Sequence, residues 1–177
     1  ETVEDVIKED DGTFTIKSAK RVSRSRAVII ALGNGAFTPR KLALEGAAEI
    51  EGNQLSYFVG HIADYAVKRV AILGGGDSAI DIALMLEPVA KEVHLVHRRD
   101  QFRGLEHTVT QLKQSSVQLD TPFLPRALTV EDDETVTLDL KKMRSDDEAQ
   151  LNVDKIVVNY GFTSNNAALN QWSLDLA

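Results

Sequence analysis

Short apolar runs, separated by glycine-rich or polar turns, alternate along the chain with a few stretches of helical periodicity. Residues 27–32 and 156–158 are apolar without alternation, which is the pattern of strands buried on both faces. The apolar run 69–73 leads into three glycines and then into a helical pattern from about 77 to 87. A second strand is predicted over 93–96. The order strand, helix, strand is typical of a parallel βαβ unit.

Weaker signals predict the elements around this unit. Apolar residues that share one face over 105–113 predict a second helix. Alternation over 135–140 predicts a half-exposed strand, which we place in a β-meander that starts near Val117 and turns at 131–134. Over 2–22 we predict short strands around a turn at Asp10-Asp11-Gly12. Over 39–53 we predict a connecting loop.

The composition narrows the class of protein. With 177 residues and 43% hydrophobic content, the chain is long enough for one large or two small packed domains. The formal net charge of -7 disfavours nucleic acid or an anionic membrane as a partner, because both attract a basic face. The absence of cysteine excludes dithiol redox centres and thiolate metal sites within these residues, and it fits a cytoplasmic location. The chain opens at Glu1 without an initiator Met, so we expect a fragment.

The glycine turn between the predicted strand and helix fits the pattern G-x-G-x-x-G/A, with Gly74, Gly76 and Ala79 at its defining positions. The first glycine permits the sharp turn, the second lets the backbone approach a pyrophosphate, and the small third residue lets helix and strand pack closely. The helix N-terminus then offers unpaired N–H groups to phosphates. The alternative is a tight turn without a ligand. At Asp77 a carboxylate is expected to act as a helix cap rather than to face a pyrophosphate.

Basic residues follow the second predicted strand, at the place where an NAD site carries a carboxylate for the ribose 2′-OH. Here the strand ends in His97, Arg98 and Arg99, with Arg103 close behind. Guanidinium groups bind a 2′-phosphate through charge-assisted bonds, so this pattern indicates NADP(H) rather than NAD(H). The alternative is a solvated basic turn. For His97, stacking on adenine and capping of the strand both remain open.

These motifs resemble the NADPH domain of the thioredoxin-reductase-like flavoproteins, the class II fold of the pyridine nucleotide-disulfide oxidoreductases. The resemblance is carried by 74–79 and 97–103, and it is narrowed by 83–88, 33–40 and 159–162. With these segments the chain looks like the thioredoxin-reductase-like ferredoxin–NADP reductases of bacteria. Thioredoxin reductases carry a C-x-x-C pair just before the glycine turn, and this chain has no cysteine there.

The resemblance implies an α/β fold, with a three-layer Rossmann-like NADP(H)-binding domain that contains a parallel sheet and a β-meander. It implies that 58–158 forms this domain, and that 1–57 and 159–177 are flanking pieces of an FAD-binding domain. It assigns Gly74, Gly76, Ser78 and Ala79 to the pyrophosphate, Arg98, Arg99 and Arg103 to the 2′-phosphate, and Gly161 and Phe162 to the nicotinamide side. Gly75, Asp77 and His97 complete the predicted set of cofactor-binding residues.

The function that the resemblance implies is a flavoprotein oxidoreductase. In the full-length protein we expect hydride transfer between NADP(H) and FAD, and electron exchange with ferredoxin or flavodoxin in a homodimer. No catalytic side chain or metal is expected from this segment, and the chain by itself is expected to be inactive. The alternatives are a thioredoxin reductase without its C-x-x-C and a stand-alone NADP-sensing module. The buried-type runs 27–32 and 156–158 disfavour the module, because they suggest a larger sheet.

Overall fold

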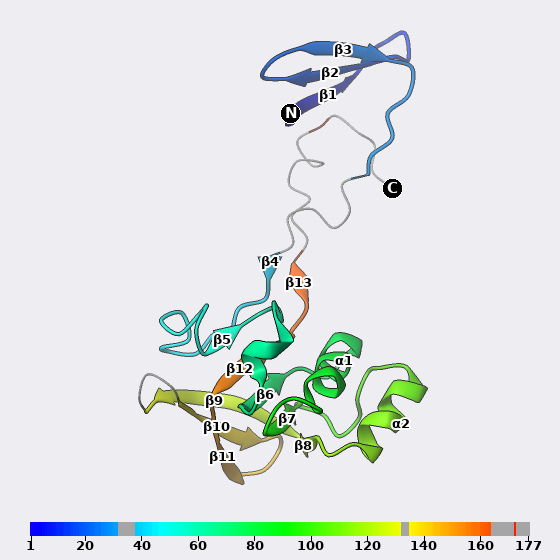
Figure 1. Ribbon diagram of the computed structural model, residues 1–177. Coiled ribbons are helices and arrows are strands. Elements are labelled where there is room, and N and C mark those ends of the chain that lie inside the picture. Colours follow the sequence, from blue (N-terminus) through cyan, green and yellow to red (C-terminus); the bar gives the residue numbers. More distant parts are fainter. Residues whose placement is uncertain (32–37, 132–134, 164–171, 173–177) are drawn as a thin grey trace. The chain divides into compact units, whose positions relative to one another are not determined.

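The computed structural model describes residues 1–31, 38–131, 135–163 and 172. The chain divides into two compact units, one of which is Pro39–Gly161 and the other Glu1–Thr38 with Phe162–Ala177 (Figure 1). β4 (Thr38–Pro39) and β13 (Phe162–Thr163) pair in a two-stranded sheet. Within the described residues, no helix has the length and apolar character needed to cross a membrane.

The smaller unit contains an antiparallel sheet in the order β1-β2-β3, formed by β1 (Val3–Lys8), β2 (Phe14–Ser18) and β3 (Val22–Ser25). The turn between β1 and β2 places Gly12 at a φ of 79°, in the left-handed region that glycine adopts without strain. Asp11 accepts hydrogen bonds from the backbone N–H and the hydroxyl of Thr13 in the same turn. The predicted strands around Asp10-Asp11-Gly12 are therefore confirmed.

The apolar run 27–32 does not form the buried strand that its sequence predicts. Residues 27–31 have no strand structure, and Leu32 lies outside the described residues. The side chains of Ile29 and Ile30 are 92% and 43% exposed. A strand buried on both faces needs hydrogen-bonded neighbours and a covering layer on each side. No described segment supplies these to residues 27–31, so the prediction is wrong for them.

The larger unit is built on a parallel sheet with the strand order β5-β12-β6-β7-β8. β6 and β7 are joined through α1, and β8 follows α2, so the predicted βαβ unit is confirmed. A single 3₁₀ turn, η1, precedes β6. The bounds are β5 (Leu55–Ser56), η1 (Ile62–Tyr65), β6 (Arg69–Leu73), α1 (Asp77–Leu86), β7 (Glu92–Val96), α2 (Glu106–Gln114), β8 (Gln118–Asp120) and β12 (Lys155–Val158).

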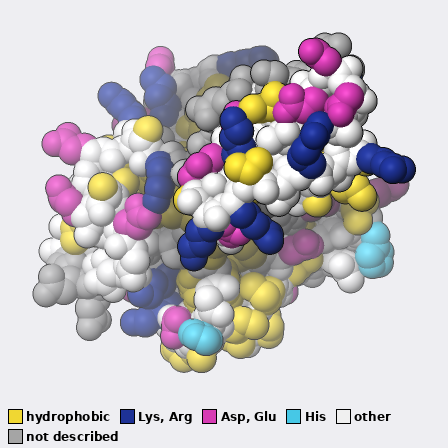
Figure 2. Space-filling model, turned by 90° about the horizontal axis from the view of Figure 1, so that it is seen from above, with side chains coloured by type: hydrophobic (Ala, Val, Ile, Leu, Met, Phe, Trp, Pro, Cys, Tyr) yellow, Lys and Arg dark blue, Asp and Glu magenta, His cyan; other side chains and the backbone are white. Residues whose placement is uncertain are grey.

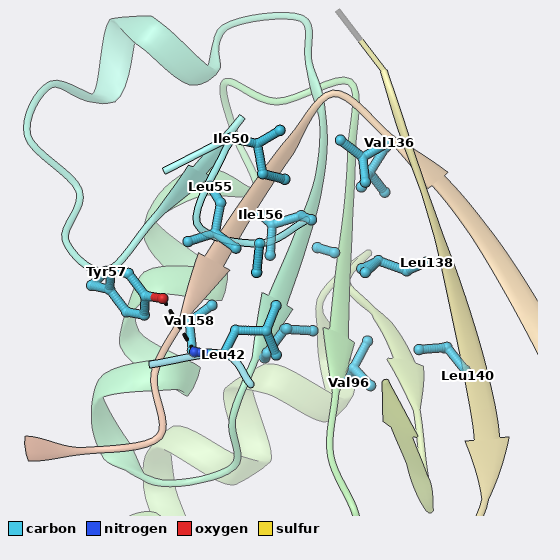
Figure 3. Packing of buried hydrophobic residues seen from close by; sticks show 14 residues of the cluster. Leu42, Ile50, Leu55, Tyr57, Val96, Val136, Leu138, Leu140, Ile156 and Val158 are labelled. Carbon is cyan, nitrogen blue, oxygen red and sulfur yellow. Dashed lines mark hydrogen bonds between the residues drawn. The ribbon is translucent and has the colours of Figure 1, made fainter. Parts of the chain in front are cut away.

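Alternate residues of the central strands face two different layers. Val70 and Ile72 of β6 pack in one apolar cluster with the buried residues of α1 and α2. Ala71 and Leu73 pack in a second cluster against an antiparallel meander on the other face of the sheet (Figure 3). The meander has the order β11-β10-β9. Its strands are β9 (Phe123–Val130), β10 (Val136–Lys142) and β11 (Glu148–Val153). Helices, parallel sheet and meander thus form the predicted three layers, visible in Figure 1.

Three features of the larger unit differ from the sequence prediction: where the meander begins, which sheet contains β12, and which unit contains the loop before β5. The meander begins at Phe123, because β8 pairs in parallel with β7 and belongs to the central sheet. β12 lies inside that same sheet, between β5 and β6, so its buried character needs no larger sheet to explain it. The loop before β5 belongs to the larger unit, where Leu42 donates its backbone N–H to the Tyr57 hydroxyl in the core (Figure 3). Of the predicted turn 131–134, residues 132–134 lie outside the described residues.

Candidate functional site

The candidate site lies at the carboxyl edge of the parallel sheet, where three neighbouring strands end in one register row. Val158 of β12 pairs with Leu73 of β6, which pairs with Val96 of β7. The backbone then continues the row, since Asn159 donates its N–H to the Leu73 carbonyl (2.8 Å) and Gly74 donates to the Val96 carbonyl (3.0 Å). β7 and β12 lie on opposite sides of β6, so the chain connections to the two strands run in opposite directions. This edge is therefore a topological switch point. Ligands of open α/β sheets bind at such points.

Each glycine of the turn meets a different environment. A Cβ atom on Gly74 would lie 2.7 Å from the Asn159 carbonyl oxygen and 2.9 Å from the Ala79 Cβ, so that strand and helix leave no room there. A Cβ atom on Gly75 would overlap the His97 ring. A Cβ atom on Gly76 would have only the Arg103 carbonyl oxygen, at 4.0 Å, near it. The protein's own packing thus requires glycine at the first two positions, whereas the third faces open space.

The N-terminus of α1 is open to an anion. Gly76 is its N-cap and has no side chain with which to cap the helix, and no described side chain does so. The first intrahelical bonds run from the Ala79 and Ile80 N–H groups to the Gly76 carbonyl (3.0 and 3.2 Å), so the amides of exposed Asp77 and Ser78 come before them. Such unpaired amides, together with the helix dipole, favour a bound phosphate.

Asp77 does not act as the cap of its own helix that the sequence predicts. Its Oδ1 accepts a hydrogen bond from the Leu105 backbone N–H (2.9 Å), at the N-cap of α2. The carboxylate therefore ties α2 to α1 and turns toward that partner. This correction follows from tertiary packing, because the sequence around Asp77 gives no sign of the distant donor.

The basic segment after β7 folds back onto the glycine turn. Arg103 donates its backbone N–H to the Gly75 carbonyl (2.7 Å), and it forms an isolated parallel bridge with Gly76. Arg98, Arg99 and Arg103 are exposed, and none of them forms an ion pair with a described carboxylate. Three uncompensated guanidinium groups thus follow one another on a short loop beside the turn. This arrangement can attract a dianion such as a phosphate monoester.

His97 is fixed between the glycine turn and this loop. Its ring stacks on Phe102 at a centroid distance of 5.5 Å and an interplanar angle of 26°. Burial lowers the pKa of its imidazole, and the positive charges of Arg98, Arg99 and Arg103 lower it further. The backbone N–H of His97 donates to the Asp120 carbonyl of β8 (3.1 Å). The imidazole is therefore neutral and borders the site, and Phe102 already covers one face of its ring.

The segment after β12 borders the turn from the other side. Burial raises the pKa of the Tyr160 hydroxyl to about 12, against the opposing effect of the nearby Arg98 charge. Gly161 has a φ of 85° and accepts a hydrogen bond from the Arg40 backbone N–H (3.0 Å). Phe162 begins β13 in the smaller unit, so of the two predicted nicotinamide-side residues only Gly161 belongs to the unit with the glycine turn.

Two site features escaped the sequence analysis. Among the described residues, the buried side-chain nitrogen and oxygen atoms without a hydrogen-bond partner are His97 Nε2 and Asn159 Nδ2. In the sequence Asn159 is one residue of the segment 159–162, and its position directly after a buried strand is the signal that could have identified it. The stacking of His97 on Phe102 has no comparable signal. No cluster of candidate metal ligands is present in the described part of the chain.

The sequence profile described as pyridine nucleotide-disulphide oxidoreductase matches residues 1–175. The chain belongs to this family. Membership confirms the resemblance inferred from the motifs.

Curated proteins are similar to the whole of this chain. A ferredoxin–NADP reductase of Limosilactobacillus reuteri (strain DSM 20016) is 97% identical over 177 residues, which is 100% of this chain and 53% of the relative. A ferredoxin–NADP reductase 2 of Bacillus subtilis (strain 168) is 48% identical over 99% of this chain and 53% of its own length. The chain therefore spans about half the length of the curated relatives it matches.

Solved structures with low sequence identity to the chain confirm the fold. Thioredoxin reductase of T. acidophilum matches with a TM-score of 0.82 and 21% identity, over 99% of this chain and 57% of that one. Thioredoxin reductase of Lactococcus lactis matches with a TM-score of 0.75 and 23% identity, over 91% of this chain and 52% of that one. At these identities the comparison supports the predicted α/β architecture.

Proposed function

We propose that this chain carries the NADP(H)-binding site of an FAD-dependent reductase. The observation that carries the proposal is the open space at Gly76. Internal packing explains glycine at positions 74 and 75, but beyond the two adjacent residues no described atom lies nearer than 4.0 Å to a Cβ placed on Gly76. A backbone that must come close to a pyrophosphate explains this third glycine.

The proposed binding mode assigns each part of the dinucleotide to one segment. The backbone of 74–79 receives the pyrophosphate at the uncapped end of α1, with Ser78 exposed beside it. Arg98, Arg99 and Arg103 receive the 2′-phosphate, and His97 forms the wall between the two phosphate sites. Gly161 and Phe162 border the nicotinamide. Each charge-assisted bond to the 2′-phosphate contributes on the order of 1.5–3 kcal/mol, so two of them favour NADP over NAD by roughly a hundredfold or more.

We extend the proposal to the complete protein as a ferredoxin–NADP reductase. Two observations support it: the relatives that carry this name, and the absence of cysteine from all 177 residues, which leaves no dithiol for a thioredoxin reductase reaction in this chain. The chemistry supplied by the bound cofactors is hydride transfer between NADPH and FAD, followed by electron delivery to ferredoxin or flavodoxin. The residues of this chain bind and orient the nucleotide, and none of them is required as an acid, base or nucleophile.

The proposal for the flanks follows the compact units of the structure. We assign Glu1–Thr38 and Phe162–Ala177 to the FAD-binding part, and Pro39–Gly161 to the nucleotide-binding part. A cytoplasmic homodimer completes this picture. Among the described residues on the face shown in Figure 2, basic and acidic side chains are interspersed. We expect the rest of the protein to contribute to the docking surface for ferredoxin or flavodoxin.

A calorimetric titration of the chain with adenosine 2′,5′-bisphosphate and with AMP tests the binding site. We expect a clear preference for the bisphosphate, which is lost in the double variant Arg98→Ala/Arg99→Ala. The variant Arg126→Ala/Arg144→Ala removes two arginines elsewhere, in β9 and after β10, and is expected to bind like the unaltered chain. Equal affinity for both ligands in a folded sample would refute the assignment of the arginines.

A further inference from the structure

The side chain of Asn159 has no role in the proposed binding mode. Its Nδ2 is buried without a hydrogen-bond partner among the described residues. Within the described residues, the other buried side-chain atom without a partner is His97 Nε2, which lies in the same register row on the opposite side of Gly74. The two buried unpaired nitrogen atoms of the described structure thus flank the glycine turn at which the proposed ligand binds.

The backbone holds Asn159 close to the turn. Its N–H donates to the Leu73 carbonyl (2.8 Å) at the end of β6. Its carbonyl oxygen and Cβ lie 2.7 and 3.2 Å from the place where a Gly74 Cβ would be. The preceding residue, Val158, is 2% exposed, which anchors this end of β12 in the core. The carboxamide is therefore carried on a rigid strand end and not on a mobile loop.

A buried amide without an acceptor is unfavourable, because it has lost its hydrogen bonds to water. An apolar side chain of similar size at this position would avoid that cost. A ligand oxygen at the turn would supply the missing acceptor. The donor is therefore explained by a binding function and not by the stability of the free protein.

The strand order identifies the part of the ligand that Asn159 meets. The arginine loop follows β7, on one side of β6, and Asn159 follows β12, on the other. A dinucleotide with its 2′-phosphate at the arginines and its pyrophosphate at the turn must continue toward β12. We propose that Asn159 is a positioning residue that donates a hydrogen bond from Nδ2 to the phosphate on the nicotinamide side of the pyrophosphate. This inference rests on the proposed NADP(H) site.

The test compares Asn159→Leu with the unaltered 177-residue chain, using three ligands in calorimetric titrations. Adenosine 2′,5′-bisphosphate lacks the phosphate on the nicotinamide side of the pyrophosphate. 2′-phospho-ADP-ribose contains this phosphate, and NADP⁺ adds the nicotinamide. We expect the variant to keep its affinity for the bisphosphate and to lose roughly ten- to a hundredfold for the other two. Asn53→Leu makes the same exchange at an exposed position at the opposite, amino edge of the sheet, where Lys155 donates to its carbonyl, and is expected to change none of the affinities.

Stability measurements separate this role from a structural one. Without ligand, Asn159→Leu is expected to unfold at the same temperature as the unaltered chain or at a higher one, because it removes an unpaired buried donor. A lowered unfolding temperature together with unchanged affinities would overturn the inference. Asn159→Asp keeps the shape and replaces the donor by a carboxylate, so it should lose more affinity than the leucine variant. This second variant also carries the test if Asn159→Leu does not fold.

The outcomes distinguish the two proposals. If the unaltered, folded chain fails to bind adenosine 2′,5′-bisphosphate, the proposed function itself is overturned. If the unaltered chain binds all three ligands and Asn159→Leu binds them equally well, only the role of Asn159 is overturned. A loss confined to NADP⁺ would also overturn it, because the contact would then be with the nicotinamide half beyond the phosphate.

Discussion

The imidazole ring of His97 occupies the space in which a side chain on Gly75 would lie. A Cβ atom on Gly75 would overlap the ring atoms Nδ1, Cε1 and Cγ. The ring has little freedom to move away, since it stacks on Phe102 and its Nε2 is buried. The absence of a side chain at the middle glycine of the turn thus leaves room for the His97 ring. The arginine loop can therefore pack against the end of β6.

We expect Gly75→Ala to lower the free energy of unfolding by about 1–3 kcal/mol, the usual cost of overpacking a tight site. Urea denaturation measures this loss. His97→Ala removes the ring, so the double variant Gly75→Ala/His97→Ala is expected to be more stable than the sum of the single effects allows. Strictly additive effects would show that the ring and the glycine do not compete for the same space.

Gly76→Ala is the matched opposite case. Gly76 has a φ of −98°, which alanine adopts without strain, and a Cβ there has no atom nearer than 4.0 Å. We expect this variant to change the free energy of unfolding by less than about 1 kcal/mol. Its affinity for NADP⁺ should fall roughly tenfold or more, because the methyl group takes the place of the approaching pyrophosphate. Unchanged affinity in calorimetry would argue against a ligand at this position.

His94 predicts a pH dependence of stability. Burial lowers the pKa of its imidazole, but the hydrogen bond to Asp120 (2.8 Å) and the charges of Asp120 and Glu92 outweigh this effect, so the pKa is raised overall. The stabilisation from protonated His94 is therefore fully present below its ordinary pKa and is lost as the pH rises through the raised value. We expect the difference in unfolding temperature between the unaltered chain and His94→Gln to shrink between about pH 6 and pH 8. A difference that grows with pH would contradict the sign.

Asp154 predicts the opposite dependence at acid pH. The hydrogen bonds from the Arg69 guanidinium and backbone N–H (both 2.7 Å) lower the pKa of its carboxyl group against the opposing effect of burial. This stabilisation is present above the ordinary pKa of the carboxyl group and is lost as the pH falls through the lowered value. We expect Asp154→Asn to lower the free energy of unfolding by on the order of 1–2 kcal/mol at neutral pH. In urea titrations the difference between the two proteins should shrink as the pH falls below about 4. A constant difference would assign the effect to shape alone.

The sequence was sufficient for the central unit because its signals are local. An apolar strand, three glycines and an amphipathic helix follow one another directly, and the structure has β6 and α1 within one residue of the predicted bounds. The same holds for the turn at Gly12, where a left-handed backbone selects glycine. The α/β class and the three layers follow from these elements and from the alternating meander.

The failures arose where the outcome depends on distant parts of the chain. An apolar run such as 27–31 becomes a buried strand only if other strands and a covering layer lie against it. Asp77 reads as a helix cap until α2 brings the Leu105 N–H within 2.9 Å. Asn159 directly follows a buried strand, which is a local signal, but its place beside the glycine turn becomes apparent only when β12 lies next to β6. In each case the missing information is a tertiary neighbour.

The central claim is that NADP(H) binds at the carboxyl edge of β6, between the glycine turn and the arginine loop. Amide NMR spectra of the ¹⁵N-labelled chain, recorded during titration with NADP⁺, test it most directly. The account predicts that the largest shift changes fall on 74–79 and 97–103, and that NAD⁺ produces much weaker changes at the arginine loop. Shift changes centred elsewhere, or none in a folded sample, would contradict it.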